Sequence, residues 1–273
     1  MKPNFKILFV LMLLAPVLSF AQSVINVYAR VTAITGTSIT ITGATGTFTA
    51  GGAIVMQMQD STIGTNTGNN GGFGNLASIQ SAGISEVVSI SSATTTTITL
   101  STALTNTYHL NNNSRVQIIS YPTLGGGGNY TLSGALTAPA WNGVTGGVVA
   151  FNVGGTLTLN SNVKVDVQGF RGGAVGTNAP SDYTCDPATF YDNAGGVSTT
   201  YYGYKGEGIH NTNGVYTVAR GKVANGGGGG NYNNTGGGGG GNLTAGGMGG
   251  LGWTCTSGTT GAGVGGIDLS NYI

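Results

Sequence analysis

Charged residues are scarce in this sequence. Only 6% of the 273 residues are Asp, Glu, Lys or Arg, about a quarter of the usual share, and the formal net charge is +1. Lys and Arg form no cluster, so the attraction that drives nucleic-acid binding is missing and nucleic acid is excluded as a partner. Because 39% of the residues are hydrophobic, we nevertheless expect a folded chain rather than a disordered one.

Helical periodicity is also missing after residue 21. No segment keeps apolar residues at a 3.6-residue spacing, and Gly or β-branched residues interrupt every candidate. We therefore expect an all-β chain with an irregular glycine-rich part.

The single long apolar run lies at the N-terminus. Lys2 and Lys6 accompany the stretch ILFVLMLLAPVLSF, and SFA at residues 19–21 fits the small-x-small cleavage rule. The run is shorter than the ~20 residues of a membrane span, which argues against the alternative of a membrane anchor. Residues 1–21 are therefore predicted to be a secretory signal peptide, with no transmembrane segment left after cleavage.

Cysteine is nearly absent, since Cys185 and Cys255 are the only two. An even number in an exported chain predicts one disulfide, which would close a loop around the glycine-rich stretch and restrict its unfolded state. Two free thiols are the alternative.

Residues 22–121 are predicted to form a β-rich domain with a loose internal duplication. The stretch VTAITGTSITITGATGTF alternates apolar and Thr or Ser residues, and a similar unit returns as VVSISSATTTTITLSTAL followed by SRVQIIS. Ile39 and Ile41 align with Ile98 and Leu100. The pattern predicts one small barrel or sandwich of two similar halves. The polar stretch STIGTNTGNNGGFGNLAS between them is predicted to be an interaction tip or a mobile connection.

Residues 122–173 carry short alternating strands beside Gly and Asn turns, as in GGVVAFNVGGTLTLNS. This spacing favours a short β-solenoid-like stack in which Leu, Val and Phe point inward. Lys164 and Asp166 are expected on its outer face, and Trp141 is expected to cap a small core.

Glycine, in contrast, is abundant, with 53 residues, and residues 174–273 contain two unbroken runs. A flexible linker is one interpretation. The other is a bundle of polyglycine II helices, which exchange backbone hydrogen bonds side by side and need glycine wherever two helices face each other. Ala245, Met248 and Leu251 are spaced by three, as on an edge helix, and this favours the bundle. Its predicted structural core comprises Gly226, Gly228, Gly230, Gly236, Gly238 and Gly241.

The order of motifs LTAPAWNGVTGGVVAFNVGGTLTLNSNVKVDVQGFRGG, GYKGEGI and ANGGGGGNYNNTGGGGGGN resembles a glycine-rich segment of large secreted surface proteins of gliding and environmental bacteria, which include adhesins. The leader ending in FAQ resembles those of Bacteroidetes-type secretors. The glycine runs are similar in kind to the polyglycine bundles of phage tail-fibre tip adhesins, of anaplastic-lymphoma-type receptor kinases and of a springtail antifreeze protein. These resemblances imply binding or scaffolding without chemistry, at the cell surface of a Gram-negative bacterium.

Residues that could carry chemistry are few. His109 and His210 are the only histidines, and neither has a metal-ligand spacing. The motif GYKGEGIHN brings Lys205 and Glu207 near His210, either as an acid/base cluster or, as we favour, as a polar turn with solvated charges. No nucleophile or nucleotide-binding motif is present, so we expect no catalytic residues and no enzyme activity.

Metal ligands are also few. Asp182, Asp186 and Asp192 could ligate calcium but lack the D-x-D-x-D-G order. We therefore expect no cofactor, with calcium as the one ion considered.

Tyrosines gather in the second half of the chain. Exposed rings could stack on sugars or anchor a protein partner, or could instead cover the edges of the glycine bundle. The predicted contact residues are Tyr183, Tyr191, Tyr201, Tyr202, Tyr204 and Tyr232.

Taken as a sequence, the chain is expected to be a secreted, non-enzymatic structural or adhesive protein, with itself, as an oligomer or fibre, or a cell-surface glycan as its partner. The alternatives are a β-solenoid that binds or processes glycans and an ice-binding protein, the latter suggested by the Thr-rich stretch TTTTITLST.

Overall fold

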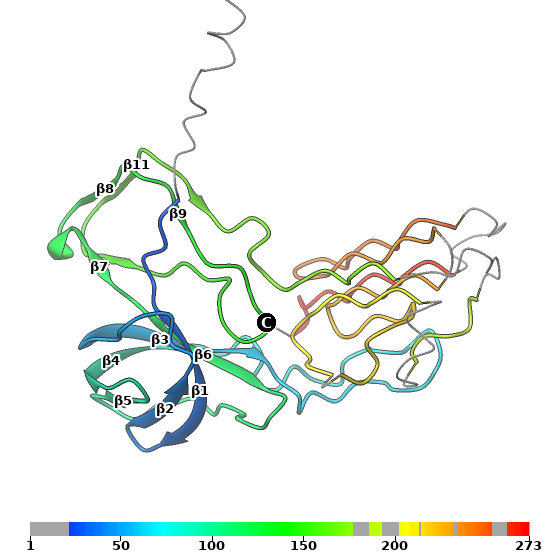
Figure 1. Ribbon diagram of the computed structural model, residues 1–273, viewed down its shortest axis with the longest axis horizontal. Helices are drawn as coiled ribbons and strands as arrows, with labels where there is room; N and C mark the ends of the chain where they lie inside the picture. Colours follow the sequence, from blue (N-terminus) through cyan, green and yellow to red (C-terminus); the bar gives the residue numbers. More distant parts are fainter. Residues whose placement is uncertain are drawn as a thin grey trace, which may run out of the picture.

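The molecule has a β-barrel at one end and an elongated glycine-rich region that extends away from it (Figure 1). This computed structural model describes residues 22–176, 186–192, 202–212, 214–231, 234–252 and 261–272. The only helix within these residues is a 3-10 turn at Gly125–Gly127. The predicted all-β class is therefore confirmed.

Six antiparallel strands form the barrel, which closes in the order β1-β2-β5-β4-β3-β6. The strands are β1 (Tyr28–Thr35), β2 (Ser38–Thr42), β3 (Gly51–Gln59), β4 (Ser85–Ala93), β5 (Thr97–Leu100) and β6 (Arg115–Ser120). Side chains of successive residues in a strand point to opposite faces, and burial alternates accordingly. In β3, Ala53 and Val55 are fully buried, whereas the residues that follow each of them, Ile54 and Met56, are only partly buried. The inward residues of all six strands, with Phe48 and Tyr108, form one apolar core.

The barrel has an internal two-fold relation. Exchanging β1, β2 and β3 with β4, β5 and β6 leaves the set of strand pairings unchanged. Ile39 pairs with Ile98 where β2 meets β5, and these are two of the residues that the sequence repeat aligns. The topology accords with a barrel built from two similar halves.

Two buried glutamines show the same relation in detail. Gln57 in β3 donates through Nε2 to the carbonyl of His109 at 3.1 Å and accepts from the His109 amide at 2.9 Å. Gln117 in β6 makes the same two bonds, of 3.1 and 2.9 Å, with Gly146. Neither side chain is exposed, and both are hydrogen-bonded, as buried amides require. Each glutamine ties a connecting loop to the barrel wall.

Short parallel ladders follow the barrel. The strands β7 (Thr123–Leu124), β8 (Tyr130–Leu132) and β9 (Leu136–Thr137) pair in the same order with β10 (Asn152–Val153), β11 (Leu157–Leu159) and β12 (Val163–Lys164). Trp141 beyond β9 is buried and packs edge-on against Phe170, with 5.6 Å between ring centroids. The sequence predicts that Trp141 caps a small core, and its burial against Phe170 is consistent with that position.

The outer ladder strands depart from the prediction. Leu157, Leu159, Val163 and Val165 were expected to point inward, but all four are exposed. Side chains stand perpendicular to a strand, so their exposure means that no described segment covers this face of the outer strands, whereas Leu132 and Leu136 of the paired strands β8 and β9 are buried. Lys164 and Asp166 are exposed, as predicted.

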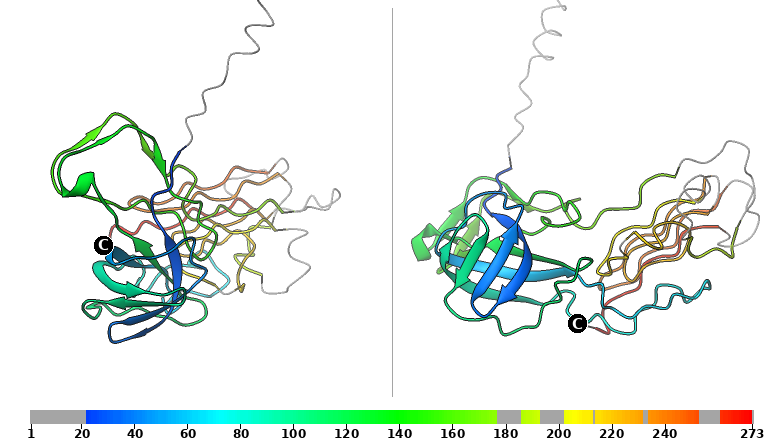
Figure 2. Two further views of the ribbon diagram at one scale, coloured as in Figure 1. Left: turned by 60° about the vertical axis from the view of Figure 1, so that its left-hand side comes forward. Right: turned by 60° about the horizontal axis from the view of Figure 1, so that its bottom comes forward.

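Extended segments of the glycine-rich region lie side by side (Figures 1 and 2) and are joined by backbone hydrogen bonds that recur every three residues. The amides of Gly236 and Gly239 donate to Gly250 and Gly247, those of Gly238 and Gly241 to Gly228 and Asn225, and those of Gly263 and Gly266 to Gly236 and Gly239. Residues 224–231 lie between the other segments and are all buried.

The polar loop after β3 is not a free connection, so that alternative of the prediction was wrong, whereas residues 66–71 at its turn are exposed. It runs along the glycine-rich region (Figure 1), where Gly74 accepts from the Ala224 amide at 3.0 Å and Leu76 accepts from the Tyr272 hydroxyl at 3.1 Å. Gly74 has φ +76°, and a Cβ there would lie 2.0 Å from the carbonyl oxygen of Lys222, so glycine is required. Ile63 and Ala82 of the loop are buried by this packing, in a cluster with Ile209, Ala224 and Leu269, and Leu76 and Ile79 are partly buried against it.

Candidate functional site

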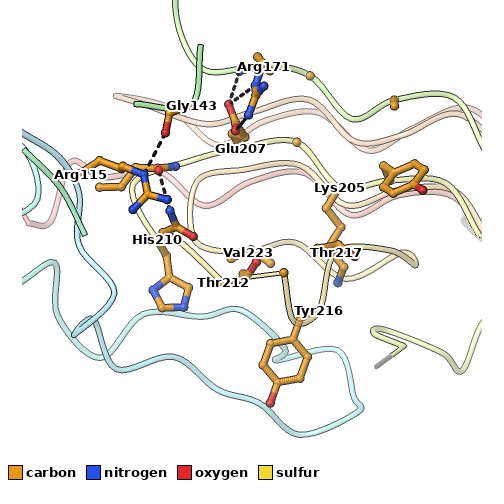
Figure 3. Close-up of a pocket in the computed structure, with 17 residues that line it drawn as sticks. Arg115, Gly143, Arg171, Lys205, Glu207, His210, Thr212, Tyr216, Thr217 and Val223 are labelled. Atoms are coloured by element: carbon orange, nitrogen blue, oxygen red, sulfur yellow. Dashed lines mark hydrogen bonds and ion pairs between the residues drawn. The ribbon is translucent and has the colours of Figure 1, made fainter. Parts of the chain in front are cut away.

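A cleft of about 500 Å³ lies where the barrel meets the glycine-rich region (Figure 3). Small-molecule sites have volumes of ~300–1,000 Å³, so the cleft is large enough for a ligand. Its charged residues are Arg115 of β6, Arg171, Lys205 and Glu207, and His210 also lines it.

The junction behind the cleft is held by the end of β3. A bulge between Gln57 and Gln59 shifts the register against β6, and such a bulge re-aims the side chains beside it. Gln59 Nε2 donates to the carbonyl of Gly208 at 2.8 Å, and Gln59 Oε1 accepts from Asn211 at 3.1 Å. The Asp60 amide adds a bond of 2.9 Å to the Ile209 carbonyl.

Arg115 is held by backbone carbonyls. Its Nε donates to Gly143 at 3.0 Å, and its NH1 donates to Asn112 at 2.7 Å and to Ser114 at 3.0 Å. Burial lowers the pKa of Arg115, and the nearby charge of Arg30 lowers it further. The guanidinium remains charged, because an unperturbed arginine titrates far above neutral pH.

Arg171 and Glu207 form a bidentate ion pair. The guanidinium Nε and NH2 lie 3.0 and 2.5 Å from the two carboxylate oxygens, and the Arg171 amide donates to the same carboxylate at 3.0 Å. Burial raises the pKa of Glu207, but the bonds from Arg171 outweigh it and hold this pKa below the usual value. Glu207 therefore stays ionised at neutral pH, when a general acid would need a proton.

Lys205 is buried, with only 9% of its surface exposed. Its Nζ donates to the carbonyl of Phe190 at 2.6 Å and lies 4.2 Å from the ring centroid of Phe73. Burial lowers the pKa of Lys205 to about 7, because desolvation disfavours the charged amine. The predicted solvated turn is therefore wrong for this residue.

Both histidines of the chain bond to Asp60. His109 Nδ1 lies 2.5 Å from the buried Asp60 carboxylate, whereas His210 Nδ1 lies 3.4 Å from the Asp60 carbonyl. Burial lowers the pKa of His210, so its ring is neutral at pH 7. Only His210 lines the cleft; His109 belongs to the network that fixes the loops around Asp60.

The tyrosines have separate roles. Tyr191 stacks on Phe73 at 5.0 Å between centroids and meets Tyr216 edge-on at 4.8 Å. Tyr202 donates its hydroxyl to Asp186 at 2.9 Å. Tyr204 is 36% exposed and lines the cleft, as does Tyr216. Of the predicted contact residues described here, only Tyr204 therefore lines the cleft.

Several predicted residues lie outside the described residues: Tyr183, Tyr201, Tyr232, Asp182 and both cysteines, Cys185 and Cys255. Asp186, one of the calcium candidates, accepts from the amides of Ala188 and Thr189 at 2.8 and 3.1 Å. Within the described ranges, no three His, Cys, Asp or Glu side chains converge as a metal site would require.

Sequence reasoning missed Arg115, Arg171 and Phe73. Arg115 lies near the start of SRVQIIS, and Arg171 stands alone in QGFRGG, so no motif for a binding site surrounds either residue. Phe73 offered one usable signal, since it is the only aromatic residue in a loop of polar and small residues. An isolated aromatic side chain in such a loop is expected to need a partner to bury it.

The assembled cleft has the properties of a binding site. Glu207 is paired with Arg171, so none of the described residues that line the cleft offers a free carboxylic acid. Arg115 and Lys205 contribute positive charge, and Asn211, Thr212 and Thr217 contribute hydrogen-bonding groups.

No family model, curated protein or solved structure matches this chain. In the described part of the chain, none of the helical structure is long and apolar enough to cross a membrane.

Proposed function

We propose that this protein is a secreted, non-enzymatic surface protein of a Gram-negative bacterium, an adhesin or the subunit of an extracellular filament. Its glycine-rich region is a polyglycine II bundle that serves as a rigid scaffold, and its barrel and loops are presented at the end of that scaffold. The observation that carries the proposal is the three-residue step of the backbone hydrogen bonds between glycine segments, which is the period of the polyglycine II helix.

Glycine is needed in this region for close approach. A Cβ at Gly227 would lie 2.0 Å from the carbonyl oxygen of Gly238, and one at Gly265 would lie 1.8 Å from that of Gly246. In the edge segment, Ala245, Met248 and Leu251 are all exposed, as side chains on the outer row of a bundle should be. A linker has no reason to combine these features, so they support a scaffold.

The ladders β7–β9 and β10–β12 support a second rigid element. Three consecutive strands pair in parallel and in order with the next three, which is the arrangement of two successive turns of a β-solenoid. The outer turn exposes Leu157 and Leu159. An open strand edge with apolar residues is a site for self-association, which supports the filament alternative.

Export is supported by the leader pattern in residues 1–21 and by a surface with few charges. The predicted disulfide between Cys185 and Cys255 belongs to the same proposal, because disulfides persist in oxidising compartments outside the cytoplasm. A secreted glycan-binding protein is the second candidate, favoured by the cleft lined by Arg115 and Lys205.

Immunogold microscopy of intact producing cells tests the proposal. We expect label on the outer surface or on filaments, and N-terminal sequencing should show cleavage after Ala21. A variant lacking residues 1–21 is the matched control and should remain inside the cell. Wild-type protein that keeps its leader and stays in the cytoplasm would contradict export, and surface label that vanishes on washing would contradict attachment.

A further inference from the structure

The cleft is positive although the whole chain is nearly neutral. Of the nine Lys and Arg residues, Lys2 and Lys6 precede residue 22, and three of the other seven line the cleft. Glu207 is the only one of the seven Asp and Glu residues in the described part of the chain that lines it, and it is paired with Arg171. The cleft therefore carries an excess of positive charge.

That excess is located on Arg115 and Lys205. Their hydrogen-bond acceptors among the described residues are backbone carbonyls, three for Arg115 and that of Phe190 for Lys205. Carbonyl dipoles orient a cation but do not cancel its charge, so both residues can still attract an anion. Arg30 lies close enough to Arg115 to lower the pKa of Arg115, and an anion beside this pair would relieve the repulsion.

The rest of the lining suits a hydroxylated ring. Tyr204 and Tyr216 line the cleft, and an aromatic side chain can stack on the apolar face of a sugar. Asn211, Thr212 and Thr217 contribute side-chain donors and acceptors for hydroxyl groups. Figure 3 shows Arg115 and Lys205 on opposite sides of the cleft, with Thr212 between them and Tyr216 below.

We propose that this cleft binds an acidic saccharide unit, a pyranose carrying a carboxylate. The carboxylate is held by Arg115, Lys205 supplies further positive charge from the opposite side of the cleft, and the hydroxyls are held by Asn211, Thr212 and Thr217. This inference rests on the proposed function, because an extracellular surface protein meets acidic polysaccharides. It goes beyond that function by naming the class of ligand and the residues that select it.

Binding is coupled to protonation of Lys205. Its pKa of about 7 rises when an anion lies beside the amine, so the complex takes up protons at pH 8. The other titratable groups that line the cleft are Arg115, Arg171, Tyr204, Glu207, His210 and Tyr216. Of these, His210 also has a pKa below its usual value, so its contribution is separated by a His210→Gln variant.

Isothermal titration of the purified chain without residues 1–21 tests the inference. The probes are galacturonate and glucuronate trisaccharides, the neutral galactose and glucose trisaccharides, and inorganic phosphate. We expect one uronate trisaccharide to bind at least tenfold more tightly than its neutral counterpart and than phosphate. Equal affinity for the acidic and neutral sugars, stronger binding of phosphate, or no binding of any probe would overturn the proposal.

Single-residue variants test which side chains bind the uronate. Lys205→Met should weaken uronate binding at least tenfold and abolish the proton uptake at pH 8. Lys222→Met is the matched control, because Lys222 is similarly buried but does not line the cleft, and it should change affinity less than twofold. If Lys205→Met fails to fold, Tyr204→Ala at a partly exposed site should still weaken binding severalfold. A folded Lys205→Met or Tyr204→Ala variant with unchanged affinity would contradict the assignment.

The outcome is separable from that of the proposed function. A protein that labels the cell surface but binds no uronate leaves the surface role intact and overturns this inference. A protein that binds uronate but stays in the cytoplasm does the reverse.

Discussion

Gly238 donates its backbone N–H to the carbonyl of Gly228 at 2.8 Å, which joins two antiparallel glycine segments. Gly241 repeats the contact three residues later by donating to Asn225 at 2.7 Å. A glycine run that is bonded in this way cannot behave as a flexible linker, because its amides are protected from solvent exchange for as long as the segments stay together.

The first prediction concerns the pattern of hydrogen exchange. The amides of Gly236, Gly238, Gly239 and Gly241 are donors, whereas those of Gly237 and Gly240 donate to no described residue. We expect the donors to exchange at least a hundredfold more slowly than Gly237 and Gly240, measured by NMR. Uniformly fast exchange across the run would show that it behaves as a flexible linker.

The second prediction compares neighbouring glycines. A Cβ at Gly249 would lie 2.0 Å from the carbonyl oxygen of Gly236, whereas one at Gly250 meets nothing within 4 Å. Gly249→Ala should therefore lower the free energy of unfolding by about 2 kcal/mol or more through overpacking. Gly250→Ala should be neutral or stabilise by up to about 1 kcal/mol, since alanine restricts the unfolded chain. Urea denaturation of both variants measures the difference, and equal stabilities would argue against the packing.

The third prediction concerns Asp60, whose side chain is completely buried. It accepts hydrogen bonds from His109, from the amide and hydroxyl of Thr62, and from the Ser81 amide. Asp60→Asn removes the charge that these donors stabilise and should lower the free energy of unfolding by about 3 kcal/mol. Asp166→Asn, at an exposed site, is the control and should change stability by less than about 0.5 kcal/mol.

Asp60 also makes the free energy of unfolding depend on pH in the acidic range. Burial raises the pKa of Asp60, but the bonds from His109, Thr62 and Ser81 outweigh it, so the folded pKa lies below the usual value. The resulting stability is present above the unfolded pKa of about 4 and is lost as the pH falls through the folded pKa. Thermal unfolding between pH 6 and pH 2 should show a steeper loss for the wild type than for Asp60→Asn.

The fourth prediction concerns Lys205 at alkaline pH. Its pKa is about 7 in the folded state, against 10.5 ordinarily, so between these values the unfolded chain binds more protons. Stability should therefore rise with pH across this window, by about 2 kcal/mol between pH 7 and pH 9. Lys205→Met should lack this rise. Denaturation curves of the two proteins at both pH values give the comparison, and parallel pH profiles would contradict the buried position of the amine.

The barrel could be predicted in large part, because its signals are local. Period-two alternation in β3 and the repeat that aligns Ile39 with Ile98 follow from strand geometry alone. The exposure of Leu157 and Val163 could not be predicted in the same way. Whether an apolar strand face is covered depends on which segments stack upon it, and alternation carries no information about that.

The candidate site, like the fold, could be predicted from the sequence only in part. The motif GYKGEGIHN placed Lys205, Glu207 and His210 close together, and the structure brings all three into one cleft. Arg115 and Arg171 come from distant parts of the chain, and no local spacing links them to that motif. The pairing of Glu207 with Arg171 decides that this carboxylate stays ionised.

The sequence by itself determined the all-β class and the three-residue spacing of the edge side chains Ala245, Met248 and Leu251. Both follow from the order of residues along the chain, because the period of a backbone conformation decides which consecutive side chains share a face. Only the tertiary structure decided that Lys205 is buried and that the cleft is positive. Desolvation of that amine requires Phe73 and Phe190, which lie on two separate loops. Burial and electrostatic potential are sums over neighbours in space, and those neighbours are set by how the loops pack against the glycine-rich region.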